Sequence, residues 1–340
     1  MNTLDQCERT GEAGSAGGVS RMKILFIATI SPYPGNPLRG AFITNRLKIL
    51  KDLDVIFDIY VPQLKDAHTL KFLKQVFGRS INRDFGSYYE VDGITYKYEY
   101  LTRNIFDVFR SKVIPKDYTQ NYAEKFAEMV YDKCKAEEFD LIHVHGMYKP
   151  ETVFTAEILS ERLHVPYVIT CHGSDINLQM PKLREIYISL MKKADKVIFV
   201  SNALLNKAVS YGFSGDNSIT IPNGIDTNKF RPLDRTKIKN ELGITKKVVG
   251  FVGSLETIKR ADKLPEIFEN ISSECEAEFI VVGNGGLENS VKRKCDKRGL
   301  RVKFVGKISQ DKVPYFMNAM DVMILPSRDE GFPAVVNEAQ

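Results

Sequence analysis

Short apolar, β-branched runs alternate along the chain with longer amphipathic stretches. The runs predict strands at residues 23–28, 57–61, 141–144, 167–170, 196–200, 218–221, 248–252, 278–282, 302–305 and 322–325. Between them, helices are predicted at 119–134, 152–163 and 183–193, among others. Strands that alternate with helices in this way are typical of parallel sheets covered on both faces. The pattern therefore predicts an α/β fold.

The opening strand pattern occurs twice, at residues 23–27 and again at 247–251. A mixed-charge stretch with Pro232 lies before the second copy, as linkers between domains often do. We therefore predict two Rossmann-like domains, residues 22–232 and 240–340. Residues 1–21 contain several glycines and no apolar run, which predicts a flexible leader and no secretory signal.

The region 65–116 departs from the alternation. Asp92-Gly93 is a strong signal for a hairpin turn, and after it Tyr96, Tyr98 and Tyr100 alternate with charged residues. The three tyrosines then share one face of a strand. This pattern predicts a half-buried hairpin at the edge of the sheet.

Two basic and apolar segments, 68–83 and 104–116, flank the hairpin. Segment 68–83 carries four basic residues and no acidic one: Lys71, Lys74, Arg79 and Arg83. If it is helical, four apolar residues fall on one side: Leu70, Leu73, Val76 and Phe77. Two interpretations stay open. Such a helix can lie in the headgroup layer of an anionic membrane, or it can pack its apolar side on the N-terminal sheet.

Composition excludes several classes of protein. The 48 Lys and Arg residues against 43 Asp and Glu residues leave a net charge of +5, too little by itself to indicate a nucleic-acid partner. The longest apolar runs fall far short of the ~20 residues that span a bilayer. Five cysteines without a Cys-x-x-Cys pair predict neither a disulfide framework nor a zinc ribbon, and favour a cytoplasmic protein.

Two glycine-rich segments fail the tests for known phosphate loops. The turn at Gly283 and Gly285 has Glu288 where a dinucleotide fingerprint needs its last glycine. The segment 35–40 ends in Gly40, but Ala41 follows where a Walker motif needs lysine. His143 and His145 share a strand face, and a metal site there would need a further Asp, Glu or Cys.

Four segments at predicted strand ends are candidate ligand-binding loops: 171–177, 221–226, 251–260 and 326–338. In the last one, Glu330 precedes Pro333, which suits the start of a helix, and Glu338 lies inside that helix. Free N–H groups at a helix start favour an anion such as a diphosphate, and Lys259 can neutralise it. Carboxylates beside it can accept hydrogen bonds from sugar hydroxyls.

Taken in order, these segments resemble glycosyltransferase family 4, the retaining GT-B glycosyltransferases of group 1. The matching segments are 31–42, 140–145, 172–175, 222–226, 252–259, 283–285 and the two glutamates of 330–338. The resemblance is loosely nearest to bacterial surface-polysaccharide enzymes. It implies two Rossmann-like domains facing a cleft, the first on the acceptor side and the second binding the donor.

The resemblance also implies roles for particular residues. The donor would be a nucleotide-sugar, with the diphosphate on Lys259, the sugar on Glu330 and the reacting centre near His172. The other donor-binding positions implied are Gly40, Ser254, Arg260, Gly283, Gly285, Gly331, Phe332 and Glu338, the last on the ribose. His145 and Asp175 would lie on the acceptor side. The implied enzyme is a retaining hexosyltransferase that needs no metal or other cofactor and acts on a glycan or lipid-linked acceptor.

Two departures from the family pattern matter. Ser254 stands where the family usually has arginine, and Arg260 or Arg328 is the candidate substitute. The chain also stops at Gln340, inside the helix of Glu338, so we expect an incomplete C-terminal domain. Two alternatives therefore stay open: a GT-B sugar-nucleotide epimerase, and a truncated nucleotide-sugar binding module without turnover.

Overall fold

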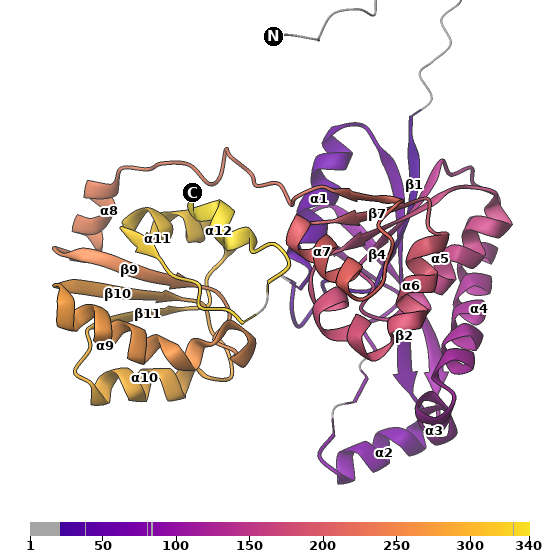
Figure 1. The fold of residues 1–340 in the computed structure, drawn as a ribbon, viewed down its shortest axis with the longest axis horizontal. Helices are drawn as coiled ribbons and strands as arrows, with labels where there is room; N and C mark the ends of the chain where they lie inside the picture. Colours follow the sequence, from indigo (N-terminus) through magenta and orange to yellow (C-terminus); the bar gives the residue numbers. More distant parts are fainter. Residues whose placement is uncertain (1–20, 38, 80, 83, 329) are drawn as a thin grey trace, which may run out of the picture.

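The computed structural model describes residues 21–340 except 38, 80, 83 and 329 (Figure 1). The predicted leader therefore lies outside the described residues apart from Arg21, and so does Arg83 of the basic segment. Two α/β bodies stand side by side, each with a central sheet. None of the helices in the described part of the chain combines the length and the apolar character needed to cross a membrane.

The first sheet contains eight strands of the described chain in the order β3-β4-β2-β1-β5-β6-β7-β8. Their bounds are β1 (Lys23–Ala28), β2 (Ile56–Asp66), β3 (Tyr88–Val91), β4 (Ile94–Arg103), β5 (Leu141–His145), β6 (Tyr167–Cys171), β7 (Lys196–Phe199) and β8 (Ser218–Thr220). All neighbours are parallel except β3 and β4. The predicted parallel sheet is confirmed.

The helices on the two faces of this sheet are α1 (Ala41–Asp52), α4 (Pro115–Cys134), α5 (Pro150–Leu163), α6 (Arg184–Lys193) and α7 (Asn202–Ser210). Two more helices, α2 (His68–Val76) and α3 (Ile105–Val113), stand at one end of the sheet, at the lower end of Figure 1. In β1, Leu25 and Ile27 join the core shared with α4 to α7, whereas Ile24 and Phe26 join the core shared with α1. Burial on both faces explains the uninterrupted apolar run in the sequence.

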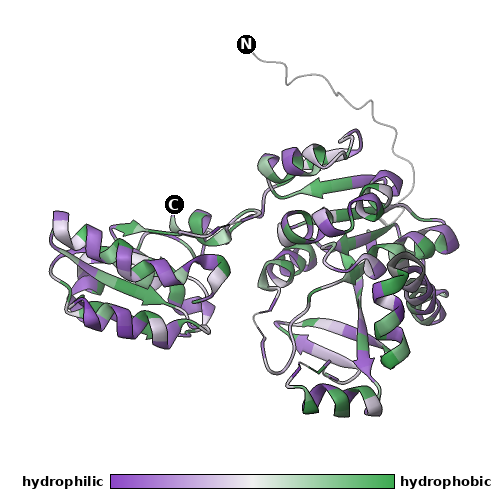
Figure 2. Cartoon of the chain, turned by 60° about the horizontal axis from the view of Figure 1, so that its bottom comes forward, coloured by the Kyte–Doolittle hydropathy of each residue, from purple (hydrophilic) through white to green (hydrophobic). Residues whose placement is uncertain are grey.

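The second sheet has four strands within the described residues, in the order β11-β10-β9-β12, and they are all parallel. Their bounds are β9 (Lys247–Val252), β10 (Ala277–Val282), β11 (Val302–Gly306) and β12 (Val322–Met323). The helices around it are α8 (Arg235–Leu242), α9 (Leu264–Glu274), α10 (Glu288–Lys297), α11 (Val313–Ala319) and α12 (Ala334–Ala339). Figure 2 shows hydrophobic strands inside and hydrophilic helix faces outside in both bodies.

The chain passes from the first sheet to the second between β8 and β9, so the crossing contains Pro232 of the predicted linker. Short helical turns occur in the loops: η1 (Asp175–Gln179), η2 (Met180–Lys182), η3 (Thr257–Lys259), η4 (Ala261–Lys263) and η5 (Gln310–Lys312). Four of them follow β6 or β9, at the strand ends from which the candidate site is built.

The predicted hairpin is present. Asp92 and Gly93 both have positive φ, 53° and 71°, as a tight two-residue turn between antiparallel strands requires. Strand β3 forms the edge, but β4 lies one position further in, where it pairs with β2 from Tyr60 to Asp66. Tyr96 and Tyr98 are accordingly buried, deeper than the half-buried face expected.

Candidate functional site

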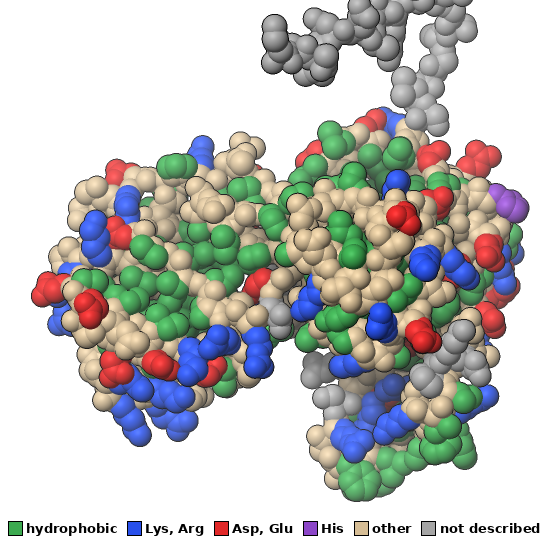
Figure 3. All heavy atoms as spheres, in the orientation of Figure 1, with side chains coloured by type: hydrophobic (Ala, Val, Ile, Leu, Met, Phe, Trp, Pro, Cys, Tyr) green, Lys and Arg blue, Asp and Glu red, His purple; other side chains and the backbone are tan. Residues whose placement is uncertain are grey.

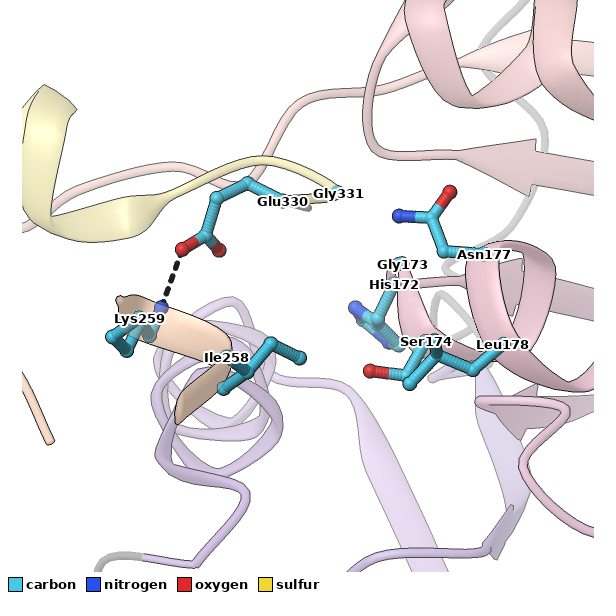
Figure 4. Close-up of a pocket in the computed structure, with 9 residues that line it drawn as sticks. All are labelled: His172, Gly173, Ser174, Asn177, Leu178, Ile258, Lys259, Glu330 and Gly331. Carbon is cyan, nitrogen blue, oxygen red and sulfur yellow. Dashed lines mark hydrogen bonds and ion pairs between the residues drawn. The ribbon is translucent and has the colours of Figure 1, made fainter. Parts of the chain in front are cut away.

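A pocket of about 240 Å³ opens between the two bodies (Figure 4). Residues of the loop and short helix after β6 form one wall: His172, Gly173, Ser174, Asn177 and Leu178. The loops after β9 and β12 form the other wall, with Ile258, Lys259, Glu330 and Gly331. Carboxyl ends of parallel strands are where α/β proteins commonly bind ligands.

Lys259 and Glu330 form an ion pair in this pocket. Lys259 ends η3, and Glu330 lies in the loop between β12 and α12. The Lys259 Nζ atom is 2.6 Å from Glu330 Oε1, and each side chain is 25% exposed. Residues 71 positions apart thus present a cation and a carboxylate at one point of the pocket. His172 lies across from them.

His172 belongs to a row of three imidazoles. His145 Nδ1 lies 3.3 Å from His172 Nε2, and the ring of His143 stacks on that of His145 at 4.3 Å. Phe42 packs against His172 at 4.4 Å between ring centroids. His145 is fully buried behind His172 in the first body, and its assignment to the acceptor side stays a prediction. Its contact with His172 fixes how the two rings lie relative to each other.

Burial keeps the three histidines neutral. It lowers the pKa of His145 and of His172 well below the usual value, and it lowers the pKa of His143 to about 3. The positive charge of Arg46 on α1 acts in the same direction on all three rings. Neutral imidazoles can accept one hydrogen bond and donate another, which suits contact with hydroxyl groups.

The histidine row predicts loss of stability in acid. A histidine whose pKa is lowered by folding binds its proton first in the unfolded chain. Its contribution to the free energy of unfolding is therefore fully present above pH ~6.5, and it is lost as the pH falls toward the pKa of the folded state. At pH 5.5, His143→Gln is expected to be less acid-sensitive than the wild type by about 1 kcal/mol. Glutamine can keep the bond that His143 Nε2 makes with Thr170 Oγ1 at 2.8 Å.

Chemical denaturation at pH 7.5 and pH 5.5 measures this difference. The control is His164→Asn, because His164 is an exposed residue with φ 57°, a conformation that asparagine tolerates. Equal pH sensitivity of the wild type and His143→Gln would show that His143 is protonated without cost in the folded protein.

Asp175 is completely buried, and its carboxylate accepts four backbone N–H groups. Oδ1 accepts from Gly173 at 2.7 Å and Ile176 at 3.0 Å, and Oδ2 accepts from His172 at 3.0 Å and Met147 at 3.3 Å. Asp175 therefore does not face the pocket, and its assignment to the acceptor side stays a prediction. The residue holds the turn that carries His172 into the pocket.

The two bodies touch at Gly173 and Gly331. A Cβ atom on Gly331 would lie 2.0 Å from the carbonyl oxygen of His172, so only glycine fits this approach. Ser201 Oγ donates to the Gly331 carbonyl at 2.7 Å, and Phe332 packs on the core of the first body. Ser201 has no signal in the sequence beyond its place after a strand.

The remaining residues predicted to bind the donor lie outside the lining of the pocket. Gly283 and Gly285 lie where the loops after β10 and β9 pack backbone to backbone, with Cβ positions 2.0 Å from Gly253 O and 2.5 Å from Leu255 O. Gly40 caps α1 with φ 71°. Glu338 is partly buried in α12, and burial raises its pKa.

Ser254 and Arg260 do not line the pocket. Ser254 is exposed in the loop after β9. Arg260 has φ 50°, and this left-handed turn directs it to a separate hollow lined also by Lys263, Glu266 and Asn270. Arg260 therefore lies outside the lining of the pocket, and its role in donor binding stays a prediction. Arg328, the other candidate substitute, is exposed and does not line the pocket either.

Asn177, Leu178 and Ile258 line the pocket without having been assigned a role from the sequence. Leu178 and Ile258 are 40% and 41% exposed and present apolar surface to the pocket. Their only signal in the sequence was their position close behind predicted strands. Among the described residues, no three His, Cys, Asp or Glu side chains are grouped so as to hold a metal ion.

Two family models match the chain in succession. The model for Glycosyltransferase Family 4 matches residues 86–229, and the model for Glycosyl transferases group 1 matches residues 234–340. The second match contains both Lys259 and Glu330, and the first contains His172. This chain belongs to the group 1 glycosyltransferases of the GT-B fold.

Curated relatives agree with this family. The teichuronic acid biosynthesis glycosyltransferase TuaC of Bacillus subtilis is 27% identical over 331 residues, which are 94% of this chain and 78% of TuaC. The N-acetyl-alpha-D-glucosaminyl L-malate synthase of Bacillus anthracis is 27% identical over 70% of this chain and 62% of its own.

Solved structures share the fold. HepE of Anabaena, crystallised with UDP, has a TM-score of 0.61 at 24% identity, covering 94% of this chain and 78% of HepE. Sucrose-phosphate synthase of Thermosynechococcus elongatus has a TM-score of 0.66 at 17% identity, covering 94% of this chain and 79% of its own. The predicted GT-B architecture is confirmed.

Proposed function

We propose that this group 1 glycosyltransferase moves a hexosyl group from a nucleotide-sugar to a hydroxyl of a glycan or lipid-linked acceptor, with retention at the anomeric carbon. The observation that carries the proposal is the Lys259–Glu330 pair facing His172 across a pocket between the two bodies. Relatives support the substrate class. One is named UDP-Gal:alpha-D-GlcNAc-diphosphoundecaprenol alpha-1,3-galactosyltransferase, from Escherichia coli, and is 27% identical over 62% of this chain.

The pocket suggests how the donor is oriented. The Lys259 ammonium binds the diphosphate, and the Glu330 carboxylate accepts hydrogen bonds from the sugar hydroxyls, so their 2.6 Å contact places the phosphates beside the sugar. Within the described residues, His172 Nδ1 is a buried atom without a hydrogen-bond partner. When the Nδ1–H group of His145 donates to His172 Nε2, the ring proton of His172 is on its Nδ1 atom. This N–H group donates a hydrogen bond to a sugar oxygen. Glu338 binds the ribose.

Retention follows a front-face displacement in this proposal. The bond from the anomeric carbon to the diphosphate breaks, and the acceptor oxygen forms its bond on the same face. The acceptor proton passes to the leaving phosphate oxygen, so no side-chain nucleophile is required. Lys259 stabilises the charge that develops on the diphosphate, and the walls of the pocket hold the acceptor on the same face of the sugar as the leaving diphosphate.

Ligand binding and product analysis test the proposal. A panel of UDP-, GDP- and ADP-sugars is screened by thermal shift, because a ligand that binds the folded state raises its apparent stability. A productive donor is then supplied with candidate acceptors, and NMR of the product gives the anomeric configuration. Donor binding without transfer would favour a binding module, and interconversion of the donor sugar would favour an epimerase. The family matches favour the transferase over both.

Turnover is expected to continue in the presence of a metal chelator. The proposed donor contacts are a lysine, two glutamates and a histidine, with no Asp-x-Asp pair after a strand to hold a divalent ion beside the diphosphate. Initial rates with EDTA and with added manganese measure the effect. Loss of activity in EDTA that manganese restores would contradict the assignment of Lys259 as the group that neutralises the diphosphate.

A further inference from the structure

Helices α2 and α3 leave the first sheet at neighbouring points. Strands β2 and β4 pair as far as Asp66 and Arg103, and the N–H of Ala67 donates to the Arg103 carbonyl at 2.9 Å. Helix α2 begins at His68, and α3 begins at Ile105. Because β2 continues for several residues beyond its pairing with β1, the two helices stand clear of the body of the domain, at the lower end of Figure 1.

These two helices carry an exposed apolar surface. All four exposed phenylalanines among the described residues lie on them or at their ends: Phe72 at 65%, Phe77 at 73%, Phe106 at 73% and Phe109 at 67% exposed. Val76, Ile105, Val113 and Ile114 extend the same surface, which we term the α2–α3 patch. Hydrophobic side chains gather at this end of the molecule in Figure 3. Contiguous exposed apolar patches of this kind mark interaction sites.

The arrangement differs from the helix face predicted by the sequence. Leu70 is only 5% exposed and turns inward, whereas Phe72 and Phe77 turn outward. Helix α2 thus packs one side on the protein and leaves its other side without a partner among the described residues, and the membrane interpretation stays open.

Positive charge accompanies the α2–α3 patch. Lys71, Arg79, Arg110 and Lys112 have no ion-pair partner within the described residues. The nearby carboxylates are engaged: Asp66 is buried and pairs with Lys74 at 2.7 Å and Arg103 at 3.2 Å, and Asp107 accepts the N–H of Asn104 in the cap of α3. Burial alone would raise the pKa of Asp66, but these bonds hold it below its usual value.

We propose that the α2–α3 patch docks on the surface of an anionic membrane. Phenyl rings enter the boundary between headgroups and acyl chains, while Lys and Arg side chains meet lipid phosphates. A second copy of the chain fits less well, because a two-fold interface uses the same surface of both copies and would bring the two sets of basic side chains together. The carboxyl ends of parallel strands share one edge, so the patch lies on the same edge of the first sheet as the loop of His172. The proposal does not depend on the transferase activity.

Vesicle flotation of the full chain tests the docking. Vesicles of phosphatidylcholine alone are compared with vesicles containing phosphatidylglycerol, at low and high salt. The protein is expected to float with the anionic vesicles at low salt and to be released by salt, because the attraction of basic side chains is screened.

Two variants separate the apolar and charged parts of the patch. Phe106→Ser/Phe109→Ser is expected to abolish flotation, and Arg110→Gln/Lys112→Gln is expected to weaken the partition coefficient about fivefold for each charge removed. The matched control is Lys294→Gln/Lys297→Gln, which removes two exposed charges from α10 on the other body. Melting temperatures show whether each variant is folded. If the phenylalanine variant does not fold, the charge variant alone tests the proposal.

Three outcomes would overturn the proposal. The first is recovery of the protein in the unbound fraction at every lipid composition. The second is equal weakening by the control on α10, which would show that net charge and not the patch is responsible. The third is concentration-dependent self-association in light scattering that the Phe106→Ser/Phe109→Ser variant loses, which would assign the patch to a second copy of the chain.

Discussion

Lys259→Ala is expected to reduce kcat/KM by about 100-fold or more, equivalent to ~2.7 kcal/mol of transition-state stabilisation. The reason is that charge develops on the leaving diphosphate, and the Lys259 ammonium lies in the pocket where this charge is proposed to form. Stability should change far less, since the Lys259–Glu330 pair is partly exposed to solvent and such pairs contribute at most ~1 kcal/mol.

Glu330→Ala is expected to lower turnover to a similar extent, but because it removes a contact with the sugar of the donor and not with the diphosphate. Glu330 is proposed to hold the transferred hexose, so its loss should spare the affinity for the nucleoside diphosphate, which lacks that hexose. Removing Glu330 also frees Lys259 from its partner at 2.6 Å, which favours the diphosphate further. Lys259→Ala should instead weaken nucleoside diphosphate binding. Calorimetry with the nucleoside diphosphate and kinetics with the full donor distinguish the two residues.

The chain offers a matched control for both variants. Lys292 and Glu288 form an ion pair of 2.7 Å on α10, outside the pocket. Lys292→Ala removes a partly exposed, ion-paired lysine without touching the proposed donor. Turnover close to that of the wild type in Lys259→Ala and Glu330→Ala together would remove the basis for the donor site.

The sequence predicted the two-sheet architecture because its inner strands are buried on both faces. Such strands appear as uninterrupted apolar runs, and most predicted bounds coincide with the observed ones or differ by one or two residues. The extension of β2 to Asp66 was not predictable from local pattern, since Pro62 normally interrupts a central strand. Its partner β4 begins about thirty residues later, at Ile94, and pairs Pro62 with Glu99.

The site was predictable to the level of loops and not of side chains. The sequence places His145, His172, Asp175 and Lys259 near strand ends, but strand-end position does not fix depth. His145 and Asp175 lie behind the pocket surface because their polar atoms are engaged by His172 and by backbone N–H groups. Arg260 follows Lys259 directly, yet its left-handed backbone separates the two side chains.

Asp175→Asn is expected to destabilise the first domain by about 3 kcal/mol or more and to impair turnover through His172. Each carboxylate oxygen accepts two backbone N–H groups, so the four bonds need two acceptor atoms. Asparagine retains one oxygen, and its amide nitrogen would face two N–H donors that it cannot satisfy. A buried donor left without an acceptor costs roughly 1–3 kcal/mol, and here two are affected.

Asp226→Asn provides the contrast. Oδ1 of Asp226 alone accepts from Asn228 at 3.0 Å and Lys229 at 3.2 Å in an exposed turn, so an asparagine oxygen can replace it with little loss. Urea unfolding of both variants gives the free energies, and turnover is measured under conditions where each is fully folded. Because Oδ1 and Oδ2 of Asp175 hold Gly173 and His172 respectively, the folded Asp175→Asn variant should still turn over more slowly than Asp226→Asn. Equal stability of the two variants would mean that the His172 turn keeps its shape without the buried carboxylate, and Asp175 would then have no positioning role.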